Sequence, residues 1–425
     1  MKHYKFTIIA LFAITVLGTP WIISSYPKTA DFVDNIFSYV GNNYTAVFFQ
    51  EVITVTQLRK KYDAVSKSRF VTKPKIRIMI VPGHEPGFGG TEFGNLKERD
   101  MAVDLANDLA FFLRNNPSYE VIISRDKQSW NPDLDLYFKN NWNEINSFVK
   151  ESKDEMVRLI NEGEVKKDID GIIHNKAPQD VAVRLYGINK WNNENKVDIA
   201  IHIHFNDYPR ENKDVPGKYS GIAIYVPEKQ YSNGTTTNVI ANSLFKRLSK
   251  YNAVSNLPKE NLGIIEEQEL IAIGADNTLD APSMLIEYGY IYEPQFTDSI
   301  VRESTIRDLA FQTYLGIQDF FGSSKDVSFA YDTLMLPFLW QKNIDKNSLN
   351  KTDILALQTA LLLEGVYPPN DKTKNDCPRS GNIGPCTLNA LNSFQKIYGI
   401  KGETDKVGNK TKKVLNNLYS VKTNI

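Results

Sequence analysis

The sequence predicts an α/β fold in which a mostly parallel sheet is covered by helices on both faces. Between residues 76 and 322, short apolar runs of strand length alternate with segments whose apolar residues recur at helical spacing. The first apolar run ends in Pro82-Gly83, which is a turn signal. Such alternation is typical of parallel sheets that lie between two layers of helices.

The expected elements follow one another along the chain. Strands are expected at 76–81, 119–124, 199–205, 221–226 and 283–287, and helices at 99–113, 238–248 and 305–321. Residues 26–75 precede them as a helical stalk or linker without visible chemistry. Catalytic residues in such sheets lie at the carboxyl ends of strands. Polar residues at those ends are therefore the first candidates for a functional site.

The composition limits the classes of function. The chain has 425 residues, with 50 basic and 50 acidic side chains, five histidines and two cysteines. Its length predicts about two or three domains, and its zero net charge argues against a nucleic-acid-binding protein. Two cysteines cannot form a four-thiolate zinc site. A nitrogen-bound metal would therefore use the histidines.

The N-terminal segment predicts export. Lys2 and Lys5 precede residues 6–23, which carry no charge and are just long enough to span a bilayer. Basic residues before such a segment predict a cytoplasmic N-terminus and an exported remainder. We expect an uncleaved signal anchor over 1–25, with a cleaved signal peptide or a buried core helix as alternatives. Either export signal places the protein in the cell envelope, anchored in the membrane or secreted.

Five polar residues stand at the expected strand ends or beside them. His84 follows the first strand, His202 and His204 lie near the end of the third, Glu287 ends the last, and Glu98 starts the first helix. Each has a structural alternative, such as a hydrogen-bonded loop histidine or an acid that favours a helix N-terminus. Together, two imidazoles and a carboxylate around an open position are what a catalytic zinc requires. A glutamate that is not a ligand could then transfer a proton.

Five motifs carry a family resemblance. They are PGH (82–84), LKERD (96–100), VIISRD (121–126), IHIHFN (201–206) and PSMLIEYGYI (282–291). In this order they resemble the zinc-dependent N-acetylmuramoyl-L-alanine amidases with a six-stranded α/β domain. The resemblance implies that His84, Glu98 and His204 bind Zn²⁺ and that Glu287 is the catalytic acid and base. It also implies cleavage of the amide between N-acetylmuramic acid and the first L-alanine of the peptidoglycan stem peptide.

The sequence departs from the family pattern at two positions. Glu85 replaces the usual glycine after the first histidine, and His202 replaces the usual serine before the second. His204 is the preferred ligand because His-x-Asn (204–206) keeps the family's spacing. We expect His202, Asn206 and Arg125 to contact substrate or to support the metal ligands.

An insertion at about 127–180 interrupts the predicted catalytic domain, which covers 76–322. It is polar and mainly helical, and we expect a surface excursion, with a lid over the site as the alternative. His174 lies within it and would block the open metal position if it were a further ligand.

The C-terminal region predicts a separate small domain after a linker at 323–349. Ile383-Gly384-x-x-Thr387-x-x-x-Leu391 recurs as Val407-Gly408-x-x-Thr411-x-x-x-Leu415. In each copy we expect the glycine to form a turn, the threonine to cap the next helix and the leucine to pack inward. Residues 350–420 resemble a three-helix peptidoglycan-binding domain, and a purely structural appendage is the alternative.

The two cysteines lie in this region. In an exported protein, Cys377 and Cys386 are expected to form a disulfide. They lie at the loop before the first repeat, where an insertion at 368–380 is expected to change the sugar or peptide preference.

The predicted function is zinc-dependent hydrolysis of peptidoglycan in wall remodelling or cell separation. The expected partners are peptidoglycan and the membrane, without nucleic acid, and a protein activator cannot be identified from the sequence. An inactive wall-binding scaffold and a zinc peptidase or deacetylase on the same polymer are the alternatives.

Overall fold

The computed structural model describes residues 49–67, 73–167, 177–323 and 331–421. The expected membrane segment at 1–25, the first part of the expected stalk and His174 lie outside these ranges. Within them, no helix is both long enough and apolar enough to cross a bilayer.

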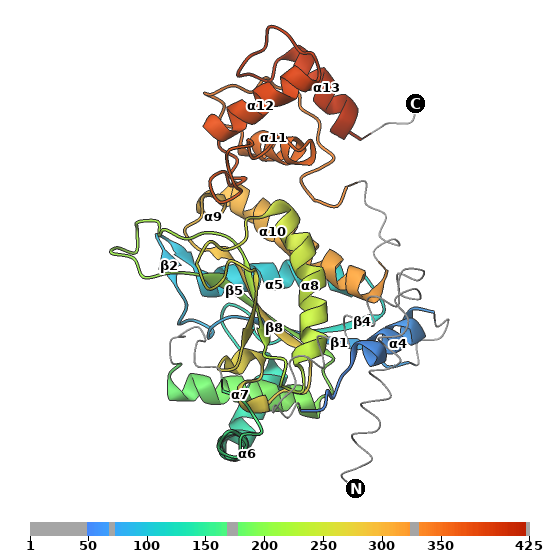
Figure 1. The fold of residues 1–425 in the computed structure, drawn as a ribbon, viewed down its shortest axis with the longest axis vertical. Coiled ribbons are helices and arrows are strands. Elements are labelled where there is room, and N and C mark those ends of the chain that lie inside the picture. Colours follow the sequence, from blue (N-terminus) through green and yellow to red (C-terminus); the bar gives the residue numbers. More distant parts are fainter. Residues whose placement is uncertain (1–48, 68–72, 168–176, 324–330, 422–425) are drawn as a thin grey trace, which may run out of the picture. The chain divides into compact units, whose positions relative to one another are not determined.

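A six-stranded sheet forms the centre of the fold, in the order β4-β1-β5-β8-β6-β7 (Figure 1). The strands are β1 (Ile76–Pro82), β4 (Tyr119–Ile123), β5 (Ile199–Asn206), β6 (Ala223–Pro227), β7 (Ile264–Glu267) and β8 (Ser283–Tyr290). Strands β4, β1, β5 and β8 are parallel, whereas β6 pairs antiparallel with β8 and parallel with β7. The predicted α/β class and the mostly parallel six-stranded sheet are confirmed.

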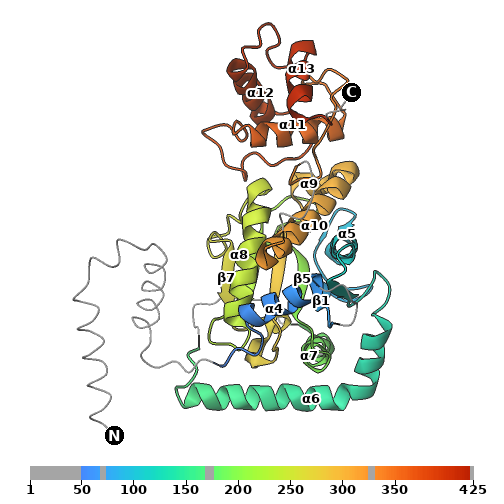
Figure 2. The ribbon, with the colours of Figure 1, turned by 90° about the vertical axis from the view of Figure 1, so that its right-hand side faces the viewer.

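Helices cover both faces of this sheet (Figure 2). The helices are α4 (Val55–Ser66), α5 (Glu98–Arg114), α8 (Gly234–Tyr251) and α10 (Ser299–Phe321) on one face, and α6 (Pro132–Asn161) and α7 (Gln179–Glu194) on the other. Side chains of β1 alternate between the two layers: Ile78 and Ile80 belong to the first core, and Met79 and Val81 to the second.

The first half of α6, within the insertion, packs against the sheet. Leu134, Phe138 and Ile145 of α6 are buried in the same core as Val183 of α7 and Val81 of β1. This helix therefore belongs to the second helical layer.

Element ends depend on local contacts that periodicity does not reveal. Helix α10 begins before the expected residue 305, because the Asp298 side chain accepts hydrogen bonds from the amides of Ile300 and Val301. Strand β7 was not expected from the apolar pattern, because its four residues include Glu266 and Glu267. Shorter elements are β2 (Glu92–Phe93), β3 (Leu96–Lys97), α9 (Pro294–Thr297) and 3₁₀ turns at Ile271–Ile273 and Ala275–Asn277.

Residues 331–421, which we call the C-terminal module, contain three helices around a second apolar core. These are α11 (Lys351–Leu363), α12 (Pro385–Ile397) and α13 (Asn409–Tyr419). Leu391 and Leu415 of the repeat are fully buried, as expected.

The expected threonine caps of the repeat are wrong. Gly384 and Gly408 occupy the N-cap positions, and the threonines lie inside the first helical turns. Thr387 and Thr411 are buried and accept hydrogen bonds from the amides of Gln358 and Gln395. The threonines therefore join helices instead of capping them.

Candidate metal centre

Three side chains from separate segments converge at the carboxyl edge of the sheet. His84 follows β1, Glu98 begins α5, and His204 lies near the end of β5. Their potential ligand atoms all lie within 4.8 Å of one another. Glu98 joins the group, because Oε2 lies 2.8 Å from His84 Nε2 and Oε1 lies 3.0 Å from His204 Nδ1.

The backbone around His84 is shaped to admit these side chains. His84 itself has φ +67°, a conformation that non-glycine residues rarely adopt and that often marks functional sites. A Cβ atom at Gly83 would lie 2.4 Å from Cε1 of His204, and one at Gly90 would lie 2.8 Å from Cδ2 of His84. Only glycine fits at these two positions without moving an imidazole.

Arg125 holds the segments that carry two of the three side chains. It is buried at the end of β4, and its guanidinium donates to the carbonyl oxygens of Pro82 (3.2 Å), Gly83 and Arg99 (3.0 Å). These carbonyls flank His84 and Glu98. Arg125 therefore supports the loop that carries His84 and the start of α5, and its guanidinium is bonded to backbone carbonyls.

The local electrostatics favour an anionic Glu98. Burial opposes its ionisation, but the neighbouring His84 and His204 outweigh burial and lower the pKa of Glu98. Its carboxylate also accepts hydrogen bonds from the amides of Thr91 (3.0 Å) and Phe205 (3.2 Å). Burial lowers the pKa of His204 despite its bond to Glu98. The cluster thus combines a carboxylate with an imidazole that is neutral near pH 7.

This donor set fits a divalent metal ion. Two imidazoles and one carboxylate form the three-ligand set of many catalytic zinc sites. The His84 Nε2 atom lies 2.8 Å from Glu98 Oε2, so these two donor atoms are close enough to face one ion. The glycine positions leave room for both rings. These residues can therefore hold zinc.

Glu287 lies beside the cluster on the neighbouring strand. It is the cross-strand partner of His204 in the β5–β8 pair and is half-buried. Its Oε2 atom is buried and has no hydrogen-bond partner among the described residues. Burial, together with the charges of Glu98 and Glu260, raises the pKa of Glu287 well above its usual value. Glu287 is therefore a buried acid with one carboxylate oxygen that no described residue bonds.

His202 lies one pleat before His204 but outside the cluster of three side chains. It is 1% exposed, and burial and the nearby His204 lower its pKa to about 3. His202 is therefore neutral near pH 7. Its Nε2 atom has no hydrogen-bond partner among the described residues.

Asn206 contacts a buried acid, Glu260, that was not among the residues expected from the sequence. The Asn206 amide donates to both carboxylate oxygens of Glu260, at 3.0 and 3.2 Å. Glu260 is 2% exposed and also accepts from the hydroxyls of Tyr225 (2.6 Å), Ser255 and Tyr290 (3.1 Å). Glu260 lies in a polar loop between α8 and β7, where no spacing signal separates a buried acid from an exposed one.

The unusual Glu85 is buried and has a cationic partner. Its carboxylate accepts from Arg184 Nε at 2.8 Å, and Arg184 on α7 also pairs with Asp180. Glu85 is 5% exposed, so this ion pair connects the His84 loop to the helix that follows the insertion. The departure from the family's glycine is therefore matched by a cation elsewhere in the chain.

A family model for N-acetylmuramoyl-L-alanine amidases matches residues 78–319, which is more than half of the chain. No curated protein matches the chain. Among solved structures, an N-acetylmuramoyl-L-alanine amidase from Clostridium difficile 630 is 19% identical, with a TM-score of 0.36, over 59% of this chain and 98% of that one. Ami1 from Mycobacterium smegmatis is 13% identical, with a TM-score of 0.37, over 59% and 100% of the two chains.

Cwp6 from Clostridium difficile is 17% identical with a TM-score of 0.37, and the match covers 58% of this chain but 29% of Cwp6. The family match spans every strand of the sheet except the start of β1. It also includes His84, Glu98, His204 and Glu287. The chain therefore belongs to the N-acetylmuramoyl-L-alanine amidase family.

Proposed function

We propose that this protein is a zinc-dependent amidase of peptidoglycan. It would hydrolyse the amide between N-acetylmuramic acid and the L-alanine that begins the stem peptide. The observation that carries the proposal is the convergence of His84, Glu98 and His204, within 4.8 Å of one another, in a member of this family.

His84, Glu98 and His204 would hold the zinc ion, and Glu287 would stay free for proton transfer. When bound, zinc supplies Lewis acidity, which polarises a carbonyl group and makes water more acidic. Arg125 would keep two of the ligands in place through the backbone carbonyls that it binds. Such support of ligands by neighbouring hydrogen bonds is a general feature of metal sites.

Glu287 would act as base and then as acid. Its carboxylate takes a proton from the attacking water as the new carbon–oxygen bond forms. The same proton then passes to the amine nitrogen of L-alanine as the carbon–nitrogen bond breaks. The unpartnered Oε2 atom supports this role, because a carboxylate without protein donors can exchange a proton.

The remaining regions would bring the site to the wall. An N-terminal signal anchor would hold the protein on the outer side of the membrane, or a cleaved signal would secrete it. The C-terminal module would bind peptidoglycan and raise the local concentration of scissile bonds. The role would be wall remodelling or cell separation, with any protein activator still to be identified.

Digestion of purified peptidoglycan tests this function. Zinc-loaded protein should release free stem peptides that begin with L-alanine and leave glycan strands intact, as identified by mass. Release by cleavage of cross-links alone would instead show a peptidase, and loss of acetate would show a deacetylase. Wall binding without any released fragment would show an inactive scaffold.

A further inference from the structure

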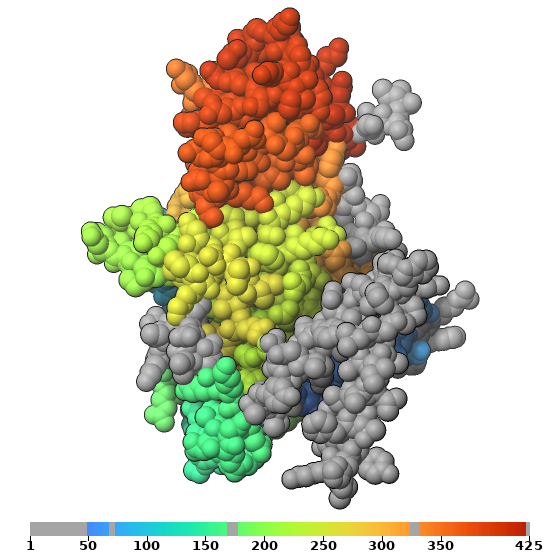
Figure 3. Space-filling view, viewed as in Figure 1, coloured from blue at the N-terminus to red at the C-terminus, as the bar shows by residue number. Residues whose placement is uncertain are grey.

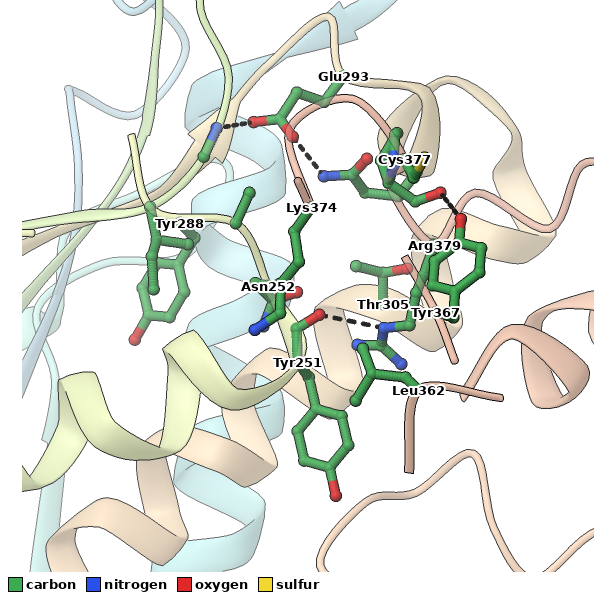
Figure 4. Close-up of a pocket in the computed structure, with 15 residues that line it drawn as sticks. Tyr251, Asn252, Tyr288, Glu293, Thr305, Leu362, Tyr367, Lys374, Cys377 and Arg379 are labelled. Atoms are coloured by element: carbon green, nitrogen blue, oxygen red, sulfur yellow. Dashed lines mark hydrogen bonds between the residues drawn. The ribbon is translucent and has the colours of Figure 1, made fainter. Parts of the chain in front are cut away.

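A loop of the C-terminal module contacts the last turn of α8. This loop, which we call the docking loop, comprises residues 368–380. Lys374 Nζ donates to the carbonyl oxygens of Ser249 and Lys250, the latter at 2.8 Å. Figure 4 shows Lys374 extending from the docking loop towards Asn252 at the end of α8.

Arg379 makes a second set of contacts from the same loop. Its Nε atom donates to the carbonyl of Tyr251 at 3.2 Å, and its guanidinium carbon lies 5.2 Å from the centre of the Tyr251 ring (Figure 4). Nη2 lies 3.6 Å from the buried Asp308 of α10, and Nη1 donates to Thr359 of α11 at 2.8 Å. Arg379 thus touches both the amidase region (78–319) and the core of its own module.

These contacts complete the carboxyl end of a helix. The last four carbonyls of an α-helix have no partner within the helix. In α8, Leu248 is bonded by the amide of Asn252, and the other three carbonyls are bonded by the two cations of the docking loop. Cations at this end also interact favourably with the helix dipole.

Neighbouring residues extend the contact. Asn375 donates to the carbonyl of Val254 at 3.0 Å and accepts from the hydroxyl of Ser220 at 2.7 Å. A Cβ atom at Gly381 would lie 2.8 Å from Val301 of α10, so the backbone just after the loop is close-packed against the amidase region. In Figure 3 the atoms of the module meet those of α8 without a gap.

A disulfide fixes the docking loop between its two cations. Cys377 is 2% exposed and is bonded to Cys386 in the first turn of α12. The Tyr367 hydroxyl, near the start of the loop, donates to the carbonyl of Pro378 at 2.9 Å. The loop is therefore held at several points by its own module, while the side chains of Lys374, Asn375 and Arg379 bond the amidase region.

We propose that the docking loop is an intramolecular docking element, which caps α8, holds the C-terminal module on the amidase region and depends on the Cys377–Cys386 disulfide for its docking conformation. The loop thereby gains a docking role in addition to the expected effect on sugar or peptide preference, which stays a prediction. A docked module presents its remaining surface in a fixed direction relative to the metal centre. Reduction by a dithiol, which becomes oxidised as the two cysteine thiols form, releases the module.

The variant Lys374→Ala/Asn375→Ala tests the docking contacts in the full chain. Both side chains bond the amidase region, so their loss should leave the module's own core intact. We expect amide hydrogen exchange at residues 248–252 to accelerate by about tenfold, as for a helix end that loses its cap. Small-angle scattering should show a broader distribution of distances.

The matched control is Asn370→Ala/Lys372→Ala, which changes the same residue types at exposed positions of the same loop. It should exchange like the unaltered chain. Equal exchange at 248–252 and equal scattering for both variants would overturn the docking role. Protected amides in α11 to α13 would show that each module remains folded, and neither measurement depends on enzymatic activity.

The disulfide is tested separately by Cys377→Ser/Cys386→Ser and by dithiothreitol treatment of the unaltered chain. Both should accelerate exchange at 248–252 as the docking variant does. If exchange there stays unchanged after complete reduction, the disulfide has no part in docking. As a control, dithiothreitol should not change exchange in the double-serine variant, which has no disulfide to reduce. An effect there would come from the reagent itself.

Discussion

At the scale of single residues, two neighbouring acids of the site have opposite surroundings. Glu260 is held by four hydrogen-bond donors, whereas Oε2 of Glu287 has none among the described residues. Donors stabilise a carboxylate, and burial without donors favours the protonated form. Different surroundings can therefore give two acids of one site different roles. Here the donors favour a carboxylate at Glu260, and their absence suits Glu287 for proton transfer.

Replacing Glu287 by Gln should separate chemistry from metal binding. The amide has nearly the same size but cannot accept the proton from water, so turnover should fall by about 10²- to 10⁴-fold. Zinc content, measured by elemental analysis, should stay at the level of the unaltered chain. Glu211→Gln, at an exposed position after β5, is the control. Full release of stem peptides by the Glu287 variant would contradict the assigned role.

Replacing Glu260 by Gln should weaken the site without removing zinc. The new amide would present hydrogens to the Asn206 amide and to hydroxyls that now donate, so the network that orients Asn206 would break. We expect a loss of about 10- to 100-fold in kcat/KM, similar to the effect of losing support around metal ligands. Glu266→Gln, an exposed acid of the next strand, should stay active. An active Glu260 variant would show that this network is only structural.

At the scale of elements, the turn from β1 to α5 shapes the candidate metal centre. Strand β1 ends with Pro82, the next residue has no side chain, and His84 then adopts a positive φ. Arg125 from the end of β4 binds the carbonyls on either side of this corner. The turn thus brings the His84 imidazole next to His204 of β5.

The Gly83→Ala variant should lose zinc affinity by about tenfold or more, comparable to the loss of support around a ligand. The added Cβ would lie 2.4 Å from Cε1 of His204, so that ring must move. Competition with a chromophoric chelator measures the affinity. Gly384→Ala is the control, because a Cβ there meets no atom within 4 Å. Unchanged affinity in the Gly83 variant would mean that His204 is not needed at its present position.

At the scale of the whole molecule, the proposed zinc site forms only when the chain folds. Glu98 and His204 are 106 residues apart in sequence, and only the folded chain brings their atoms to 3.0 Å. A ligand that binds only the native state stabilises it in proportion to the logarithm of its concentration. The metal should therefore stabilise the amidase region.

Removal of zinc by a chelator should lower the Tm of the protein. Zinc at 100 times its Kd contributes about 2.7 kcal/mol, which corresponds to about 5–10 °C for a region of this size. Differential scanning calorimetry with and without zinc measures the shift. The His204→Ala variant should show no zinc-dependent shift. An equal shift in that variant would place the bound metal elsewhere.

Much of the site could be predicted from the sequence, because its residues lie in or beside the expected strands, although β8 continues past Glu287 to Tyr290. His84, Glu98, His204 and Glu287 occupy positions that the alternation of strands and helices already brings to one edge. Glu260 could not be predicted, because its burial depends on hydroxyls and an amide from separate segments that meet only in the folded chain. The same reason explains the missed partner of Glu85, since Arg184 follows 99 residues later.

The sequence by itself determined the α/β class and the positions of most strands along the chain, because apolar periodicity is a local property, and its motifs indicated the candidate ligands through the family resemblance. It also placed two cysteines where the structure has a disulfide. Only the tertiary structure decided that the threonines of the repeat join helices, that Arg125 binds backbone carbonyls, and which elements the docking loop contacts. These are long-range hydrogen bonds, and their partners are chosen by packing and not by neighbouring sequence.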